Sequence, residues 1–345
     1  MTLLEMNDLK VHFPTNEGVV KAVDGVTYSL DEGQTLCVVG ESGSGKSVAA
    51  RAILGIVHQP GKVVGGSIRY HQSLNGSRET VDITALDPRG AKIRRIRGAE
   101  IAMIFQEPMT SLSPLYTVGS QIIEAILLHN DISKLEARNR AIELLRQVGI
   151  PRPESRIDEY PFRLSGGMLQ RCMIAMALSC NPKLLIADEP TTALDVTTQA
   201  QILDLMRDLQ EQYHMAILFI THDLGVVAEI ADKVAVMYLG TVVEQGDVDT
   251  IFNAPAHPYT QALLSSIPKI SLERAHLNPI KGMVPSPFNR PAGCPFHPRC
   301  TVAVRGVCDE VTPEAITVDD GHTARCLLHD PRYRAQFAAK EVLHG

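Results

Sequence analysis

Gly40-Glu-Ser-Gly-Ser-Gly-Lys-Ser47 is the stretch that decides the fold of this 345-residue chain. It fits the pattern G-x-x-x-x-G-K-[S/T] at every position. The apolar run Thr35–Val39 before it has the length of a β-strand, and Val48–Leu54 after it has a helical pattern. Glycines let backbone N–H groups turn inward, and a helix N-terminus carries partial positive charge. The segment therefore predicts a phosphate-binding loop, and this context on both sides disfavours an incidental glycine- and serine-rich turn.

Two side chains of the loop have predicted roles toward a nucleoside triphosphate. Lys46 should reach the β- and γ-phosphates, and Ser47 should ligate Mg²⁺. The predicted nucleotide-binding positions of the loop are Gly40, Glu41, Ser42, Gly43, Ser44, Gly45, Lys46, Ser47 and Val48. A site of this kind binds ATP together with Mg²⁺.

A second apolar run, Leu184–Ala187, ends in the two carboxylates Asp188 and Glu189. Asp188 is placed to hold Mg²⁺, directly or through water, as in other nucleotidases with a phosphate loop. Glu189 can orient or deprotonate the attacking water. Such a strand end has little weight alone, but it becomes a specific signal when it is paired with the phosphate loop.

Farther from the loop, strand and helix patterns alternate. Apolar runs at 183–188, 216–220 and 234–239 read as strands, and 200–210 reads as a helix between two of them. This alternation predicts an α/β protein with a parallel sheet and helices on its faces. Helical periodicity from about 119 to 178 predicts an inserted helical block. The basic run at 92–97 is interpreted as a solvated helix face.

Bulk properties exclude several classes of protein. No run approaches the roughly 18–20 apolar residues that cross a bilayer, and the start of the chain lacks the layout of a signal peptide. The net charge of −6 gives no indication of the strongly basic surface that is typical of nucleic-acid-binding proteins. We therefore expect a cytoplasmic protein with no nucleic-acid partner, which would serve a membrane only through other subunits.

The segment Leu164-Ser-Gly-Gly-Met168, followed by Gln170 and Arg171, resembles the signature of ABC ATPases. The resemblance implies that this helix N-terminus binds the γ-phosphate held by an opposite subunit. The implied contacts are Ser165, Gly166, Gly167 and Met168. Met168 replaces the usual glutamine, which removes a polar side chain but leaves the backbone donors.

Further segments match the ABC family in order. Gln106 matches the Q-loop, which contacts Mg²⁺ or the water. Asp195, in Ala193-Leu-Asp195, matches the D-loop, and His222 matches the switch histidine. The implied catalytic group is thus Lys46, Gln106, Glu189 and His222, and the implied Mg²⁺ ligands are Ser47, Gln106 and Asp188. Phe13 lies where the family stacks an aromatic residue on adenine, with Tyr28 as the alternative and a core role for Phe13 also open.

The ABC resemblance implies a RecA-like parallel-sheet core with an N-terminal antiparallel β part. We expect the nucleotide-binding domain over residues 1–250, with the helical subdomain inserted at about 107–178. Beyond about 250 the chain is rich in proline and loses periodicity. Residues 251–345 are therefore predicted to form a loop-rich extension, not a second core of the same kind.

A narrower resemblance covers nearly the whole chain. The segments 107–112, 188–195 and 257–260 and the cysteine-containing tail look like the ATPase subunits of dipeptide and oligopeptide importers, nearest to the dipeptide-permease type. It implies a second, paralogous ATPase subunit, two transmembrane permease subunits and an extracytoplasmic substrate-binding protein. Relatives of these importers carry nickel or glutathione, so the cargo stays open. A soluble ABC ATPase acting on nucleic acid is disfavoured, because the interval from Gln106 to Leu164 has no room for a long coiled coil.

Cysteines fall into two groups. Cys37, Cys172 and Cys180 lie in apolar segments and read as buried thiols. Cys294, Cys300, Cys308 and Cys326 crowd the tail with the spacing C-x₅-C-x₇-C-x₁₇-C. Disulfides are disfavoured in a reducing cytoplasm, and four thiolates in a loop-rich segment suggest a metal. The resemblance implies a [4Fe–4S] cluster. Zinc, with His297 as a substitute ligand, and no metal at all are the alternatives.

Overall fold

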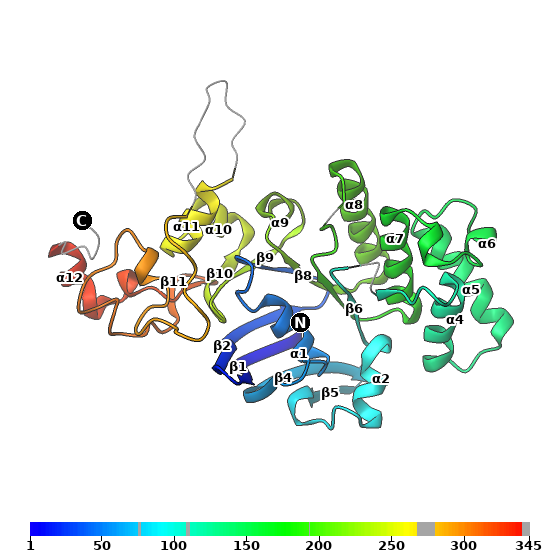
Figure 1. Cartoon of the computed structure of the whole chain (residues 1–345), viewed down its shortest axis with the longest axis horizontal. Coiled ribbons are helices and arrows are strands. Elements are labelled where there is room, and N and C mark those ends of the chain that lie inside the picture. Colours follow the sequence, from blue (N-terminus) through cyan, green and yellow to red (C-terminus); the bar gives the residue numbers. More distant parts are fainter. Residues whose placement is uncertain (75–76, 108–110, 193, 268–279, 340–345) are drawn as a thin grey trace, which may run out of the picture.

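The computed structural model describes residues 1–74, 77–107, 111–192, 194–267 and 280–339, and it contains two sheets flanked by helices (Figure 1). The strands are β1 (Thr2–Thr15), β2 (Gly18–Asp31), β3 (Thr35–Val39), β4 (Lys62–Leu74), β5 (Ser77–Asp82), β6 (Ile101–Ile104), β7 (Leu184–Asp188), β8 (Ala216–Thr221), β9 (Lys233–Tyr238), β10 (Thr241–Asp247), β11 (Ile316–Asp319) and β12 (His322–Ala324). The helices are α1 (Lys46–Ile53), α2 (Ala91–Ala99), α4 (Val118–His129), α5 (Lys134–Gln147), α6 (Pro153–Arg156), α7 (Gly166–Ala177), α8 (Val196–Tyr213), α9 (Leu224–Ile230), α10 (Val248–Asn253), α11 (Pro258–Ser265) and α12 (Arg334–Ala339).

The central sheet has the strand order β11-β12-β10-β9-β3-β8-β7-β6. Strands β9, β3, β8, β7 and β6 run parallel, while β10, β12 and β11 are antiparallel additions. Every residue of β3, β7 and β8 is buried, as expected for parallel strands covered on both faces. The phosphate loop leaves the carboxyl end of β3, inside this sheet, where such folds bind their ligands.

Alternate residues of β3 pack into two separate apolar cores. Cys37 and Val39 join the core shared with the helices α4, α5, α7 and α8, and Leu36 and Val38 join the core beneath the N-terminal strands. Those strands form a second, antiparallel sheet with the order β2-β1-β4-β5. The fold is the predicted α/β ABC cassette, with its parallel core and its N-terminal antiparallel part.

The inserted helical block is present as α4 to α7 and lies at the opposite end of the molecule from the C-terminal segment (Figure 1). Residues 108–110, at the start of the predicted 107–178 subdomain, lie outside the described residues. The basic run belongs to α2, whose Ile93 and Ile96 are buried. Arg97 departs from the predicted solvated face, because its guanidinium donates to the carbonyl oxygens of Leu54, Pro88 and Gly55.

The C-terminal extension is rich in loops, and it also contributes two short strands that were not predicted. Its strand β12 pairs with β10, with Glu244 opposite Ala324, and β11 pairs with β12. The extension therefore continues the central sheet. These two strands could not be predicted from the sequence, because they are short and β11 is mostly exposed. The division at residue 250 stays a prediction. Within the described residues, no helix has the length and apolar character needed to cross a bilayer.

Candidate nucleotide site

The phosphate loop requires glycine at two closely packed positions. Gly40 has φ +153° and Gly45 has φ +97°, and both belong to the region that L side chains rarely adopt. A Cβ atom would lie 2.2 Å from the carbonyl oxygen of Met237 at Gly40, and 2.2 Å from that of Ala22 at Gly45. The loop is therefore held tightly between β9 and β2, and it leads directly into α1.

A cavity of about 410 Å³ opens beside this loop. It is lined by Val20, Lys21, Ala22, Ser42, Gly43, Ser44, Gly45, Lys46, Ser47, Val48, Gln106, Glu189, Leu239, Gly240, Pro287 and Arg290. Most of the predicted loop contacts are thus on the cavity wall, while Gly40 and Glu41 lie behind it. Gln106 and Glu189, two of the predicted catalytic residues, also line the cavity.

Lys46 is buried at the base of the loop. Its Nζ donates hydrogen bonds of 2.8 Å to the carbonyl oxygen of Gly40 and 3.1 Å to that of Glu41. Burial lowers the pKa of Lys46, and the nearby carboxylates of Glu189 and Asp188 act in the opposite direction. The ammonium group is thus held beside the cavity by loop carbonyls and surrounding negative charge.

Ser47 and Asp188 form a pair that suits Mg²⁺. The Ser47 hydroxyl donates to Asp188 Oδ1 at 2.7 Å. Asp188 is fully buried, and its Oδ2 finds no hydrogen-bond partner among the residues that the structure describes. Burial raises the pKa of Asp188. A buried carboxylate oxygen without a partner, next to a hydroxyl, is a hard oxygen donor set that fits Mg²⁺.

Glu189 is the point on which the other predicted catalytic residues converge. Gln106 Nε2 donates to Glu189 Oε2 at 3.0 Å, and the Thr192 hydroxyl donates to the same oxygen at 3.1 Å. His222 Nδ1 lies 3.4 Å from Glu189 Oε1. Glu189 also has φ +48°, an uncommon backbone conformation for a residue with a side chain. The arrangement holds one carboxylate at the cavity wall, in position to orient or deprotonate a water molecule.

The predicted signature lies on a different part of the molecule. Ser165 is the N-cap of α7, and its hydroxyl accepts a hydrogen bond from the Met168 N–H at 3.4 Å. Ser165 and Gly166 are exposed, whereas Gly167 and Met168 are partly buried, and none of the four lines the cavity. A helix N-terminus turned to the surface in this way is free to meet a nucleotide held by another subunit.

The D-loop residue Asp195 caps α8. Its side chain accepts from the N–H of Thr198 at 3.0 Å and from the Thr198 hydroxyl at 2.7 Å. These hydrogen bonds lower the pKa of Asp195. Ala193, the first residue of the predicted D-loop, lies outside the described residues.

Phe13 does not line the cavity. Its ring covers Gly61, where an added Cβ would lie 2.5 Å from Phe13 Cε1. Tyr28, the alternative residue for adenine stacking, is buried in the core beneath the N-terminal sheet. The stacking role of Phe13 stays a prediction, and this arrangement favours the core role for both rings.

The C-terminal extension contacts the phosphate loop, and these contacts were not predicted from the sequence. Arg299 forms a bidentate ion pair with Glu41, at 2.7 and 3.0 Å, and the hydroxyl of Tyr259 accepts from the Glu41 N–H at 2.9 Å. Pro287 and Arg290, also from the extension, line the cavity itself. No local pattern marks these residues, because their partners lie more than two hundred positions away in the sequence.

The four tail cysteines surround one small apolar pocket, together with Phe296, His297 and Phe337. Burial raises the pKa of Cys294 and of Cys326 to about 12 and that of Cys300 to about 11. Backbone N–H groups point at these sulfurs and act in the opposite direction. Within the described ranges, no three Cys, His, Asp or Glu side chains come together closely enough to hold a metal ion.

Comparison with known proteins matches the two parts of the chain separately. Residues 23–192 match the family described as ABC transporter, and residues 243–308 match the family described as oligopeptide/dipeptide transporter, C-terminal region. Two solved structures of the ATP-binding cassette MJ0796 resemble the fold at 27% identity, one of them in a post-hydrolysis state bound to ADP and Pi. Their TM-scores are 0.60 and 0.61, and each comparison covers 71% of this chain and 99% of the cassette.

Curated relatives match over nearly the full length. The oligopeptide transport ATP-binding protein AppD of Bacillus subtilis is 52% identical over 95% of this chain and 97% of its own length. The dipeptide transport ATP-binding protein DppD of Escherichia coli is 50% identical over 94% of this chain and 96% of its own length. With the phosphate loop, Asp188, Glu189 and the signature helix in the arrangement described above, the chain belongs to the ABC ATP-binding proteins of the oligopeptide and dipeptide importer family.

Proposed function

We propose that this chain is the ATP-hydrolysing subunit that powers import of dipeptides or oligopeptides across the cytoplasmic membrane. The observation that carries the proposal is the convergence of Gln106 and His222 on Glu189, beside the buried Lys46. The matched C-terminal region and the peptide-transport names of the relatives support the cargo.

The chain's own residues suggest the course of hydrolysis. The loop N–H groups and Lys46 bind the phosphates. Ser47, Asp188 and Gln106 would hold Mg²⁺, which would neutralise the charge that develops on the phosphates. Glu189 accepts a proton from the attacking water as the bond from the γ-phosphorus to its bridging oxygen breaks. His222, next to Glu189, contacts the γ-phosphate, and Ser165 with its neighbouring N–H groups contacts the γ-phosphate of the opposite subunit.

The proposed assembly contains a second, paralogous ATPase subunit, two transmembrane permease subunits and an extracytoplasmic substrate-binding protein. This chain would lie at the cytoplasmic face of the membrane and be attached through the permease subunits. Its D-loop, with Asp195, would line the interface between the two ATPase subunits. The cavity here binds nucleotide and not cargo, so nickel or glutathione is the alternative cargo of the same machine.

ATP-dependent uptake tests this function directly. The assembled transporter is reconstituted in vesicles, and uptake of a labelled dipeptide is compared with uptake of nickel and of glutathione. We expect peptide uptake that requires ATP and disappears in a Lys46→Ala variant. Uptake of nickel or glutathione without peptide uptake would reassign the cargo, and full peptide uptake by the Lys46→Ala variant would remove the motor role.

The tail cysteines are the proposed ligands of a [4Fe–4S] cluster. Four sulfurs around one apolar pocket, each with backbone N–H groups nearby, are consistent with thiolate ligation. Such a cluster would cross-link the extension. Zinc is the alternative, with His297 as a substitute ligand, although His297 Nδ1 lies 2.9 Å from the Cys294 carbonyl oxygen. Anaerobically purified protein should contain iron and acid-labile sulfide. Protein that contains neither would contradict the proposed cluster.

A further inference from the structure

The C-terminal extension contributes two residues to the wall of the nucleotide cavity. Pro287 and Arg290 share this wall with Val20, Lys21 and Ala22 of β2. The loop that carries them lies on the β1–β2 hairpin, because an added Cβ at Gly18 would lie 3.7 Å from Phe288 Cδ1. The cavity lining and the proximity of Phe288 to Gly18 therefore both place this loop beside β2 and the cavity.

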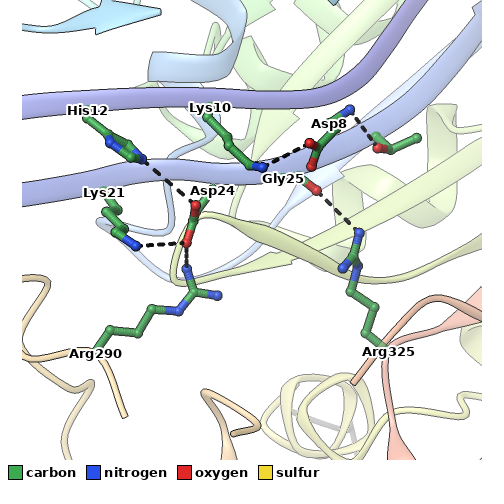
Figure 2. A network of polar contacts seen from close by, with 9 residues as sticks. Asp8, Lys10, His12, Lys21, Asp24, Gly25, Arg290 and Arg325 are labelled. Carbon is green, nitrogen blue, oxygen red and sulfur yellow. Dashed lines mark hydrogen bonds and ion pairs between the residues drawn. The ribbon is translucent and has the colours of Figure 1, made fainter. Parts of the chain in front are cut away.

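Arg290 is held in place by Asp24 of β2. Figure 2 shows Asp24 between two cationic side chains and an imidazole, with Arg290 Nη1 at 2.8 Å, Lys21 Nζ at 3.9 Å and His12 Nε2 at 3.8 Å. Only 22% of the Arg290 side chain is exposed. Among contacts between described residues, Nη1 is the one guanidinium nitrogen with a hydrogen-bond partner. The planar group thus has further donors to offer to a ligand in the cavity that it lines.

The direction of a bound nucleotide follows from the catalytic end. Because Glu189 and Gln106 act at the γ-phosphate and Lys46 at the β- and γ-phosphates, the adenosine must extend away from them along the cavity. Apart from the phosphate loop and the two catalytic residues, the cavity wall consists of Val20, Lys21, Ala22, Leu239, Gly240, Pro287 and Arg290, and this part of the wall is what remains for the adenosine. Phe13 does not line this part of the wall.

We propose that Arg290, which is anchored by Asp24 and shares the cavity wall with Pro287, binds the adenosine part of ATP, so that the C-terminal extension completes the chain's own nucleotide pocket. A guanidinium can stack on an aromatic base or donate to ribose oxygens. Pro287 and Arg290 lie outside the matched segment 23–192 and inside the matched segment 243–308. A compact cassette without the extension therefore lacks both residues.

The dissociation constants of the full chain for ATP and for inorganic triphosphate distinguish binding of adenosine by Arg290 from a general effect on the phosphate loop. Inorganic triphosphate occupies the loop but has no adenosine. We expect Arg290→Ala to raise the Kd for ATP about tenfold and to change the Kd for triphosphate by less than about twofold. Isothermal titration calorimetry measures both constants.

Arg325→Ala is the matched control. Arg325 also connects the extension to β2, since its guanidinium donates to the Gly25 carbonyl oxygen at 3.3 Å (Figure 2), but it does not line the cavity. It should leave both constants unchanged. Arg290→Gln retains a hydrogen-bond donor for Asp24 and gives the same reading if the alanine variant is unstable. An unchanged ATP constant in Arg290→Gln, or equal losses for ATP and triphosphate, would overturn the proposal.

Discussion

At the scale of single residues, the adjacent carboxylates Asp188 and Glu189 differ because their surroundings differ. Asp188 ends β7 fully buried, with Ser47 on one oxygen. Glu189 has turned into a left-handed backbone conformation at the cavity wall, where Gln106 and His222 approach it. Burial suits the first carboxylate to a cation, and partial exposure to the cavity suits the second to water.

The same residues show what sequence alone could supply. The residue types and the roles of Lys46, Asp188 and Glu189 follow from local motifs with a strand before them. The gathering of Gln106 and His222 around Glu189 follows from neighbouring parallel strands, which end at one edge of the sheet. The ion pair of Arg299 with Glu41 could not be predicted, because no periodic pattern connects residues 258 positions apart.

Loss of that ion pair should destabilise the chain. The Arg299 side chain is only 3% exposed, so Arg299→Ala leaves Glu41 without its bidentate partner. We expect the free energy of unfolding to fall by about 2–3 kcal/mol, measured by urea denaturation. The control Arg138→Ala removes an exposed bidentate pair with Asp158 and should cost less than about 1 kcal/mol. Equal losses for the two variants would contradict the buried character of the Arg299 contact.

At the scale of elements, continuous apolar runs made β3, β7, β8 and β9 predictable to within one or two residues. Those strands are buried on both faces, so their sequences carry a strong signal. The strands β11 and β12 were missed. They have four and three residues, and β11 is mostly exposed. Their position depends on pairing with β10, which a sequence pattern does not reveal.

The N-terminus of α7 should affect hydrolysis more than nucleotide binding. Ser165→Ala removes the N-cap and should cost about 1 kcal/mol of stability. Because Ser165 does not line the chain's own cavity, ATP affinity should be unchanged while the ATPase rate of the assembled transporter falls. Ser133→Ala is the control, since Ser133 caps α5 in a capping box. The Ser133→Ala substitution should lower the free energy of unfolding by a similar amount and leave the ATPase rate unchanged. A lower ATPase rate in both variants would show that the effect of Ser165→Ala comes from helix stability and not from contact with a nucleotide.

Glu244 joins three elements of the C-terminal half. Its buried carboxylate accepts from the N–H groups of Ala256 and His257 and lies 2.8 Å from His322 Nε2. Glu244→Ala leaves these buried groups without their partner, and we expect a loss of roughly 3–5 kcal/mol. Limited proteolysis should then cut the extension at lower protease concentrations.

Glu79→Ala serves as the matched control for that variant. Glu79 forms an exposed pair with Lys92. Its removal should cost less than about 1 kcal/mol and should leave the proteolysis pattern unchanged. Resistance of the Glu244→Ala variant to both urea and protease would show that β10 does not anchor the extension.

At the scale of the whole molecule, the two surfaces that we propose to bind nucleotide lie on separate parts of one chain. The phosphate loop and Glu189 belong to a cavity beside β3, and the predicted signature is at the N-terminus of α7, which belongs to the helical block (Figure 1). The extension adds Arg299 behind the phosphate loop and Arg290 at the cavity wall. Its integration into the central sheet explains how residues near the C-terminus can act on a loop near the N-terminus.

We expect this cavity to hydrolyse ATP with Glu189 as the group that activates water. The most direct measurement is the ATPase rate and the ATP affinity of a Glu189→Gln variant in the assembled transporter. Glutamine keeps the shape and the contact with Gln106 but cannot accept the proton, so ATP should still bind while hydrolysis slows by about 10²–10⁴-fold. Hydrolysis at nearly the wild-type rate would contradict the assignment of Glu189, whereas bound ATP that persists without turnover would confirm it.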